Sequence, residues 1–345
     1  MGTLAGMSIV VTALDPADEV GVRHAFDIRS QSDAADLPDF PPLLAGQFAA
    51  SLRHPWPGER HVWALAWLGD EPIGFLELGL PFLENTGTAE LRIDVLPSWR
   101  RRGAGRALLA HAEQVARADG RKHLIGTTVH GLPGGPERPL DGEAFARSRG
   151  ATLALTDVRR RLSVSALDHA ALDALVSTAW AKAAGYSLVR WEAAVPDEFL
   201  ADVAYLDGRL LSDAPLGELA YEAQKIDGDR FRAQEAARAA RGRVIHSTAA
   251  RHDASGRLVA VTTIDVNVEI PWHAFQQITL VDPDHRGHRL GALVKVQNLR
   301  TVLAASPALR AIDTWNAAVN THMIGINEAM GFRPLDGWHN WQITL

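Results

Sequence analysis

The sequence predicts a mixed α+β protein built from two tandem copies of one domain. The chain has 345 residues, more than one hydrophobic core normally serves and enough for about two domains. A glycine-bearing motif occurs twice, 186 positions apart, and a second landmark recurs at nearly the same spacing. In each copy strand-like patterns precede the motif and a long helical pattern follows it, which predicts a sheet flanked by helices.

The first landmark runs from Val95 to Gly105 (VLPSWRRRGAG) and recurs from Val281 to Gly291 (VDPDHRGHRLG). The second is a helix-like run that ends at Gly150 in one copy and 181 positions later in the other. Two landmarks at nearly constant spacing predict a duplication; a coincidence of short motifs would not keep the spacing. We place the two domains at residues 1–164 and 165–345.

Each predicted element has a local reason. In the first copy, residues 61–67 and 73–78 predict a hairpin, and the alternation over 89–95 predicts a third strand. Pro97 ends that strand because it has no N–H to donate, and apolar residues at helical spacing then predict a helix up to residue 120. A further strand over 157–164 closes the copy.

The second copy repeats this order. Its predicted hairpin covers 246–250 and 258–264, its third strand 277–281 and its helix 293–303, which Ser306-Pro307 ends.

Composition excludes several classes of protein. Hydrophobic residues make up 47% and charged residues 22%, which excludes disordered, collagen-like and coiled-coil chains. The chain has no cysteine, so disulfides, cysteine zinc sites and thiol nucleophiles are excluded. A net charge of −6 argues against a nucleic-acid partner. Without a signal peptide or a long apolar stretch, we expect a cytoplasmic protein with no membrane partner, its oligomeric state left open.

The repeated motif predicts a phosphate site. A loop between a strand and a helix presents backbone N–H groups at the positive end of the helix dipole, where phosphate binds. Gly103 and Gly105 let a ligand approach the backbone, and the neighbouring arginines add positive charge. A solvated basic edge around an ordinary turn is the alternative, which the repeat in both copies disfavours. A dinucleotide site is disfavoured because the full G-x-G-x-x-G is missing.

The pattern Val-x-Pro-x-x-Arg-x-x-Gly-x-Gly resembles the acyl-CoA pyrophosphate signature of the GNAT superfamily of N-acetyltransferases. The resemblance implies a mixed, mostly antiparallel central sheet in each half, with the strand ending at Val95 splayed to hold the pantetheine arm of acetyl-CoA. The pyrophosphate would lie on the N–H groups of residues 101–106. The implied CoA-binding residues of the first copy are Asp94, Val95, Leu96, Arg100, Arg101, Arg102, Gly103, Ala104, Gly105 and Arg106.

The second copy departs from the signature, because Arg289 stands where the first motif glycine is expected. Residues 320–332 resemble the family's closing helix, which adds Asn316 and Asn320 to the CoA set, although Asn320 could equally be an ordinary N-cap. The tandem architecture is similar to that of mycothiol synthase. The implied residues on the strand and loop are Leu280, Val281, Arg286, Gly287, His288, Arg289, Leu290, Gly291 and Ala292.

The resemblance implies direct acetyl transfer from CoA to a small amine, since no cysteine can hold an acyl group. Glu90 is the candidate general base in the first copy, and Asp265, Glu269 and His273 are the candidates in the second. Each also fits an ordinary polar role. His285 and His288 lack metal-site spacing, so no metal is expected.

The usual tyrosine acid of the family is replaced by Ala146 in one copy and Asn327 in the other. The three tyrosines of the chain (186, 205 and 221) offer no obvious substitute. This motivates an alternative, a non-catalytic acyl-CoA-binding or regulatory protein. The complete phosphate loop favours the first copy for CoA binding, and the closing helix favours the second for turnover. Acidic stretches at 33–39 and 197–213 suit a cationic acceptor.

Overall fold

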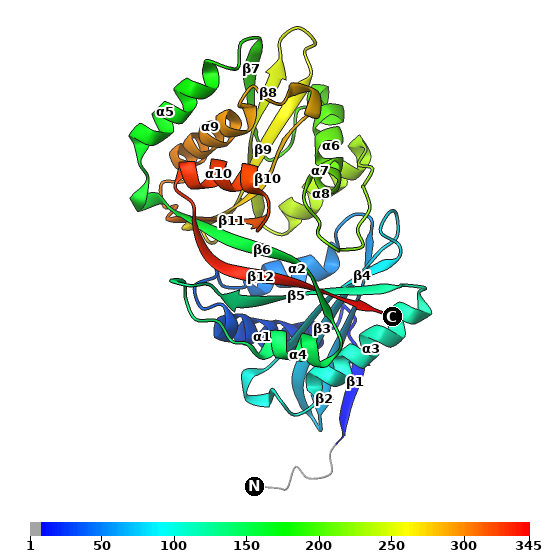
Figure 1. The fold of residues 1–345 in the computed structure, drawn as a ribbon. Helices are drawn as coiled ribbons and strands as arrows, with labels where there is room; N and C mark the ends of the chain where they lie inside the picture. The colour runs from blue at the N-terminus through cyan, green and yellow to red at the C-terminus, as the bar shows by residue number, and fades with distance from the viewer. Residues whose placement is uncertain (1–7) are drawn as a thin grey trace.

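In the computed structural model, which describes residues 8–345, twelve strands form one continuous sheet with helices on both faces (Figure 1). The segment inspected for a signal peptide begins in residues 1–7, outside the described residues. Among residues 8–345, no helix has both the length and the apolar character needed to cross a membrane.

The predicted strands and helices of the N-terminal half are all present, and the structure adds four elements that the sequence did not indicate: two helices and a strand near its start and the strand β5 (His123–Gly131). In chain order the elements of this half are β1 (Ile9–Ala13), α1 (Glu19–Asp36), α2 (Ala45–Arg53), β2 (Glu59–Leu68), β3 (Glu71–Pro81), β4 (Thr88–Val95), α3 (Ala104–Ala118), β5 (His123–Gly131), α4 (Asp141–Ser148) and β6 (Thr152–Ser163).

The C-terminal half repeats this order, with one further helix at its start and a short one after α6. Its elements are α5 (His169–Trp180), β7 (Tyr186–Glu192), α6 (Leu200–Gly208), α7 (Leu210–Asp213), α8 (Gly228–Ala240), β8 (Arg243–His252), β9 (Leu258–Asn267), β10 (His273–Val281), α9 (Leu290–Ala305), β11 (Ala311–Ala317), α10 (Thr321–Met330) and β12 (Arg333–Thr344).

The duplication predicted from the landmarks is therefore confirmed in the order of the elements. The second landmark also repeats in conformation, because Gly150 and Gly331 follow α4 and α10 with φ of 76° and 104°. This left-handed backbone favours glycine. The limits 1–164 and 165–345 stay a prediction.

The two halves exchange their last strands. The sheet order is β1-β2-β3-β4-β5-β12-β6-β11-β10-β9-β8-β7. The last strand of the chain, β12, thus lies between β5 and β6, while β6 lies beside β11 (Figure 1). Each half is completed by a strand from the other, so the sheet continues through the middle of the molecule.

Packing on both faces buries the middle strands. In the N-terminal half α1 contacts β3 from one face and α3 contacts it from the other. On α3, Leu108, Ala112 and Ala116 recur every four residues and are buried. Side chains on both faces of β3 are therefore buried, and the strand has a nearly continuous apolar sequence.

Candidate active site

Both glycine-bearing loops present unpaired backbone N–H groups. Among the described residues, the backbone amides from Arg101 to Arg106 donate to no backbone carbonyl. The first helical hydrogen bond is the one from the amide of Ala107 to the carbonyl oxygen of Gly103. In the second loop the amides from Gly287 to Ala292 likewise have no backbone partner among the described residues. The first helical hydrogen bond there runs from the amide of Leu293 to the carbonyl oxygen of Arg289. Each set surrounds the N-terminus of a long helix, α3 or α9. This arrangement, here called the amide cradle of each loop, is suited to bind an anion such as pyrophosphate.

The loops share one backbone conformation although their residues differ. Arg101 and Gly103 have positive φ angles of 64° and 100°, and Gly287 and Arg289 have 87° and 56° at the equivalent positions. Arginine and glycine have thus exchanged places between the copies. Arg289, which stands at the position of the first motif glycine, adopts the left-handed backbone conformation although it has a Cβ.

Gly103 is the loop residue that tolerates a side chain least. We expect Gly103→Ala to lower the free energy of unfolding by about 1–2 kcal/mol, because its φ of 100° is strained for any L-residue. Urea unfolding measures this. Gly105→Ala is the matched control, since its Cβ would meet Phe145 at 3.5 Å and Val95 at 3.9 Å, which are ordinary contacts. Equal effects of the two changes would contradict the prediction.

The motif arginine of each loop anchors the loop to the protein. Arg100 donates to both carboxylate oxygens of Asp36 at 2.7 and 2.8 Å and to the carbonyl of Val95 at 3.3 Å. Arg286 donates to one carboxylate oxygen of Asp213 at 2.9 Å and to the carbonyl of Val281 at 3.3 Å. Both guanidinium groups were expected to bind CoA, but here carboxylates hold them.

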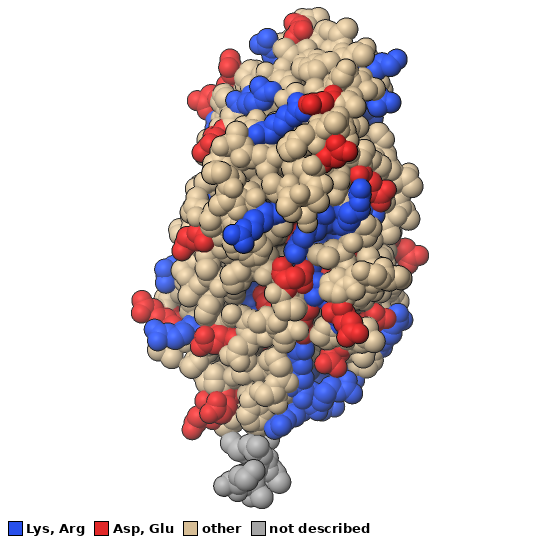
Figure 2. Space-filling view, turned by 90° about the vertical axis from the view of Figure 1, so that its left-hand side faces the viewer, with Lys and Arg blue, Asp and Glu red and all other residues tan. Residues whose placement is uncertain are grey.

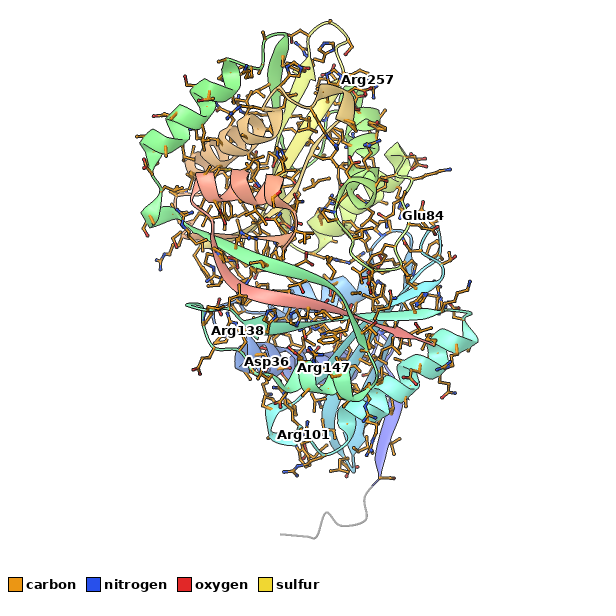
Figure 3. All side chains as sticks on the ribbon, viewed as in Figure 1. Asp36, Glu84, Arg101, Arg138, Arg147 and Arg257 are labelled. Atoms are coloured by element: carbon orange, nitrogen blue, oxygen red, sulfur yellow. The ribbon has the colours of Figure 1, made fainter. Side chains whose placement is uncertain are left out.

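The arginines of the first loop that no carboxylate of the described chain holds, and that could contact a phosphate, lie on the surface of the N-terminal half. Arg101, Arg102 and Arg106 are exposed, and Arg102 stacks on Trp99 with 4.8 Å between its guanidinium carbon and the ring centre. Arg101 lies at the lower end of the molecule in Figure 3, where Figure 2 shows Lys and Arg gathered. Positive charge therefore surrounds the first cradle.

The parallel strands beside the first loop separate. β4 pairs with β5 only from Thr88 to Leu91, whereas its pairing with β3 continues to Val95. In the C-terminal half, β10 pairs with β11 only from His273 to Phe275. In both copies the later residues of the strand before the loop, β4 or β10, thus have backbone groups free to bond a ligand.

A cavity of about 1070 Å³, here the β4–β5 cavity, extends from the first loop along the gap between these strands. Of the residues predicted to bind CoA in this half, only Leu96 and Arg102 are missing from its lining. Ala146 is also in the lining, where the family's tyrosine was expected. The walls further include Phe145 of α4 and Asn340 and Trp341 of the exchanged β12, which the sequence did not indicate.

At the inner end of this cavity, Tyr221 donates a hydrogen bond of 2.8 Å to Glu90. Glu90 reaches solvent through the cavity, yet protein atoms surround most of it. Burial, together with the charge of Glu59, raises the pKa of Glu90 above its ordinary value of 4.5, and the bond from Tyr221 opposes this rise. A carboxylate with a raised pKa beside a ligand cavity is suited to act as a general base.

Tyr221 comes from the other half of the chain. Residues 214–227, between α7 and α8, reach across to the turn that joins β3 and β4 (Figure 3, near the label of Glu84). Asn85 and Glu222 bond each other's backbone amides at 2.6 and 2.7 Å, and Glu84 pairs with Arg230 at 2.8 Å. No pattern in the sequence indicated this contact, because it depends on the docking of the two halves.

The candidate bases of the second copy are held by other groups. Asp265 pairs with Arg243 at 2.7 Å, and Glu269 accepts a bond of 2.7 Å from Gln47 of α2. His273 is buried and bonds Asp313 at 3.0 Å. None of the three candidates lines the β4–β5 cavity.

The second copy also differs inside its binding region. Asn320 caps α10 by accepting from the amide of Met323, and Asn316 accepts from Asn327 at 2.6 Å. Lys295 occupies the position equivalent to Leu109, which lines the first cavity. Only 1% exposed, Lys295 has a pKa lowered to about 7 by burial.

For the remaining residues of the second set, Leu280 and Leu290 are buried, and His288 faces the carbonyl of Lys182 at 3.0 Å. The described residues contain no group of three or more His, Cys, Asp or Glu side chains placed to hold a metal ion.

A splayed parallel strand pair beside an amide cradle is the arrangement of a transferase that uses acyl-CoA. Residues 30–132 match the model of the acetyltransferase (GNAT) family. A tandem GNAT protein from the clavulanic acid biosynthesis pathway, in a structure without AcCoA, is 32% identical, with 98% of each chain covered and a TM-score of 0.82. The chain therefore belongs to the GNAT family and has a tandem GNAT architecture, as its motifs predicted.

More distant structures share the fold alone. A GCN5-related N-acetyltransferase from Sphaerobacter thermophilus is 12% identical, with 97% of this chain and 95% of that chain covered and a TM-score of 0.63. A glucosamine N-acetyltransferase region of a fungal multi-domain β-N-acetylglucosaminidase is 10% identical, with 98% of this chain and 38% of that chain covered and a TM-score of 0.68. Comparison with curated proteins gives no match.

Proposed function

We propose that the protein is an acetyl-CoA-dependent N-acetyltransferase and that transfer to a small amine occurs in the N-terminal half. The single observation that carries this is the β4–β5 cavity, which joins the cradle of free amides to the Glu90 carboxylate. The sequence favoured the C-terminal copy for turnover. We now prefer the N-terminal copy, because its candidate base lines a cavity and those of the second copy have protein partners.

Each part of this half has a role in the proposed reaction. The amides from Arg101 to Arg106 hold the pyrophosphate, and the free edge of β4 after Leu91 holds the pantetheine arm. Glu90 accepts a proton from the attacking amine as the C–N bond forms and the C–S bond of the thioester breaks, and CoA leaves as a thiolate that takes a proton from water. Tyr221 positions the Glu90 carboxylate.

Two matched variants test which half binds the donor. We expect Gly105→Asp to weaken CoA binding by at least about tenfold, because a carboxylate in the amide cradle repels pyrophosphate. Gly291→Asp makes the same change in the second loop, where the glycine has similar neighbours. Calorimetry with CoA and mass spectrometry of a panel of amines with acetyl-CoA provide the readouts. Loss of transfer in Gly291→Asp alone would assign the reaction to the other half.

The alternative of a non-catalytic CoA-binding protein rests on the missing family tyrosine at Ala146. It predicts that the wild-type protein binds acetyl-CoA tightly and transfers the acetyl group to no amine of the panel, even at high protein concentration. That result would overturn the proposed enzyme activity.

A further inference from the structure

A second cavity, here the seam cavity, lies between the two halves and has a volume of about 380 Å³. Glu90 and Tyr221 line it as well as the β4–β5 cavity, so both cavities meet at the candidate base. Trp56 comes from the N-terminal half, and Trp191 and Phe231 come from the C-terminal half. A molecule in this cavity can therefore contact Glu90.

Two charged side chains in the wall have no charged partner in contact. Asp207 of α6 and Arg238 of α8 make no side-chain hydrogen bond or ion pair with any residue of the described chain. They are close enough to influence each other's charge, but not in contact. Arg238 stacks on Trp56, with 4.9 Å from its guanidinium carbon to the ring centre. Stacking fixes the plane of the guanidinium and leaves its N–H edges available.

Two buried polar atoms in the same wall also have no partner. Gln234 and Ser247 are each 2% exposed, and neither Gln234 Oε1 nor Ser247 Oγ is hydrogen-bonded within residues 8–345. Buried polar atoms are normally satisfied, because an unmade hydrogen bond costs about 1–3 kcal/mol. Together with the separated Asp207 and Arg238, they form a polar wall suited to a zwitterion.

The end of the seam cavity near the candidate base is acidic. Glu59 and Glu90 both line it; Glu59 has His61 at 3.4 Å, and neither carboxylate pairs with a lysine or arginine of the described chain. The fourth carboxylate of the lining, Glu235, is already held by Arg232 at 2.6 Å and by the amide of Val195. An amine is therefore favoured at this end.

We propose that the seam cavity binds the acceptor and that the acceptor is an α-amino acid with an amine on its side chain. Its α-carboxylate lies on Arg238, its α-ammonium on Asp207 and Gln234, and its side-chain amine at Glu90. The aromatic walls cover the methylene chain between the two ends. This inference rests on the proposed transfer at Glu90, and it gives the docking of the two halves a function, because neither half alone encloses the cavity.

The test compares L-lysine with three molecules that each lack one group. 1,5-Diaminopentane lacks the carboxylate, 6-aminohexanoate lacks the α-amine and L-norleucine lacks the side-chain amine. We expect lysine or a shorter diamino acid to bind at least about tenfold more tightly than its truncated analogues, as measured by calorimetry with the full chain. Where acetyl transfer occurs, its kcat/KM follows the same order. Equal binding of the four molecules would overturn the proposal.

Variants assign each contact. Arg238→Gln removes the preference for lysine over 1,5-diaminopentane, and Asp207→Asn removes the preference over 6-aminohexanoate. Asp229→Asn on the exposed start of α8 is the matched control and changes neither preference. If Arg238→Gln and Asp207→Asn keep both preferences, as the control does, the assigned contacts are wrong.

The outcomes separate this inference from the proposed function. If lysine binds and this binding is lost in Asp207→Asn, but no amine is acetylated, the seam site is supported and the proposed enzyme activity is overturned. Acetyl transfer to amines that bind no better than norleucine overturns the seam site and keeps the activity. Competition between CoA and lysine would show that the two molecules occupy the same site, which also overturns the proposal.

Discussion

Replacing Glu90 by glutamine lowers kcat/KM for acetyl transfer by about 10²- to 10⁴-fold, the usual contribution of a general base. Glutamine keeps the size of the side chain and an oxygen that accepts from Tyr221, so the cavity keeps its shape. CoA binding, measured by calorimetry, therefore stays unchanged. Glu71→Gln on the exposed start of β3 is the matched control. An unchanged rate in Glu90→Gln would remove this residue from the mechanism.

The pH dependence of this reaction has a defined sign. Glu90 acts as a base only when ionised, so the rate falls as the pH falls through its pKa, which burial raises above 4.5. The bond from Tyr221 stabilises the charged form and lowers that pKa. Tyr221→Phe removes the bond and shifts the acid limb of the kcat/KM profile to higher pH. A shift to lower pH, or an unchanged acid limb in Glu90→Gln, would contradict this assignment.

Local signals predicted the elements around the first loop. The alternation over 89–95, the proline at 97 and the apolar spacing on α3 each depend on neighbours in sequence, and the structure has β4 and α3 at these places. The recurrence of the same signals in the second copy was enough to predict the duplication. The family's loop could thus be located from the sequence alone.

The exchange of β6 and β12 could not be predicted in this way. A strand pattern shows that a segment is extended, but it does not show which neighbour the segment pairs with. The same limit applies to Tyr221 and to the seam cavity, whose walls come from residues more than a hundred positions apart. The sequence predicted that Arg100 and Arg286 bring positive charge to the loops. It did not predict that the carboxylates of Asp36 and Asp213 pair with them.

The exchanged strands are joined by a buried ionic network, in which Arg159 of β6 has the central position. Its guanidinium pairs with Asp336 of β12, with Asp313 of β11 at 3.2 Å and with Asp39 of the α1–α2 connection at 3.0 Å. Arg159, Asp313 and Asp336 have no exposed surface. Arg138 and Arg161 supply the remaining positive charge (Figure 3 labels Arg138).

This network also contains His273, which was proposed from the sequence as a general base. Burial alone would raise the pKa of Asp313, but the hydrogen bonds from Arg161 and His273 lower it to about 2. The stability that this carboxylate contributes is present above its ordinary pKa of 3.8 and is lost as the pH falls toward 2. His273 therefore helps to compensate a buried charge between the halves.

Arg159→Met is expected to lower the free energy of unfolding by about 3–5 kcal/mol, because it leaves buried carboxylates without their shared partner. Urea unfolding at neutral pH measures the loss. Arg60→Met is the matched control, since Arg60 is half-exposed in its pair with Asp119, and such surface pairs contribute about 0–1 kcal/mol. Adding Asp336→Asn to Arg159→Met removes one of the uncompensated charges and should restore part of the loss.

If Arg159→Met costs no more than Arg60→Met, the network does not hold the exchanged strands together. The shared sheet would then depend on the β5–β12 and β6–β11 hydrogen bonds and on apolar packing alone.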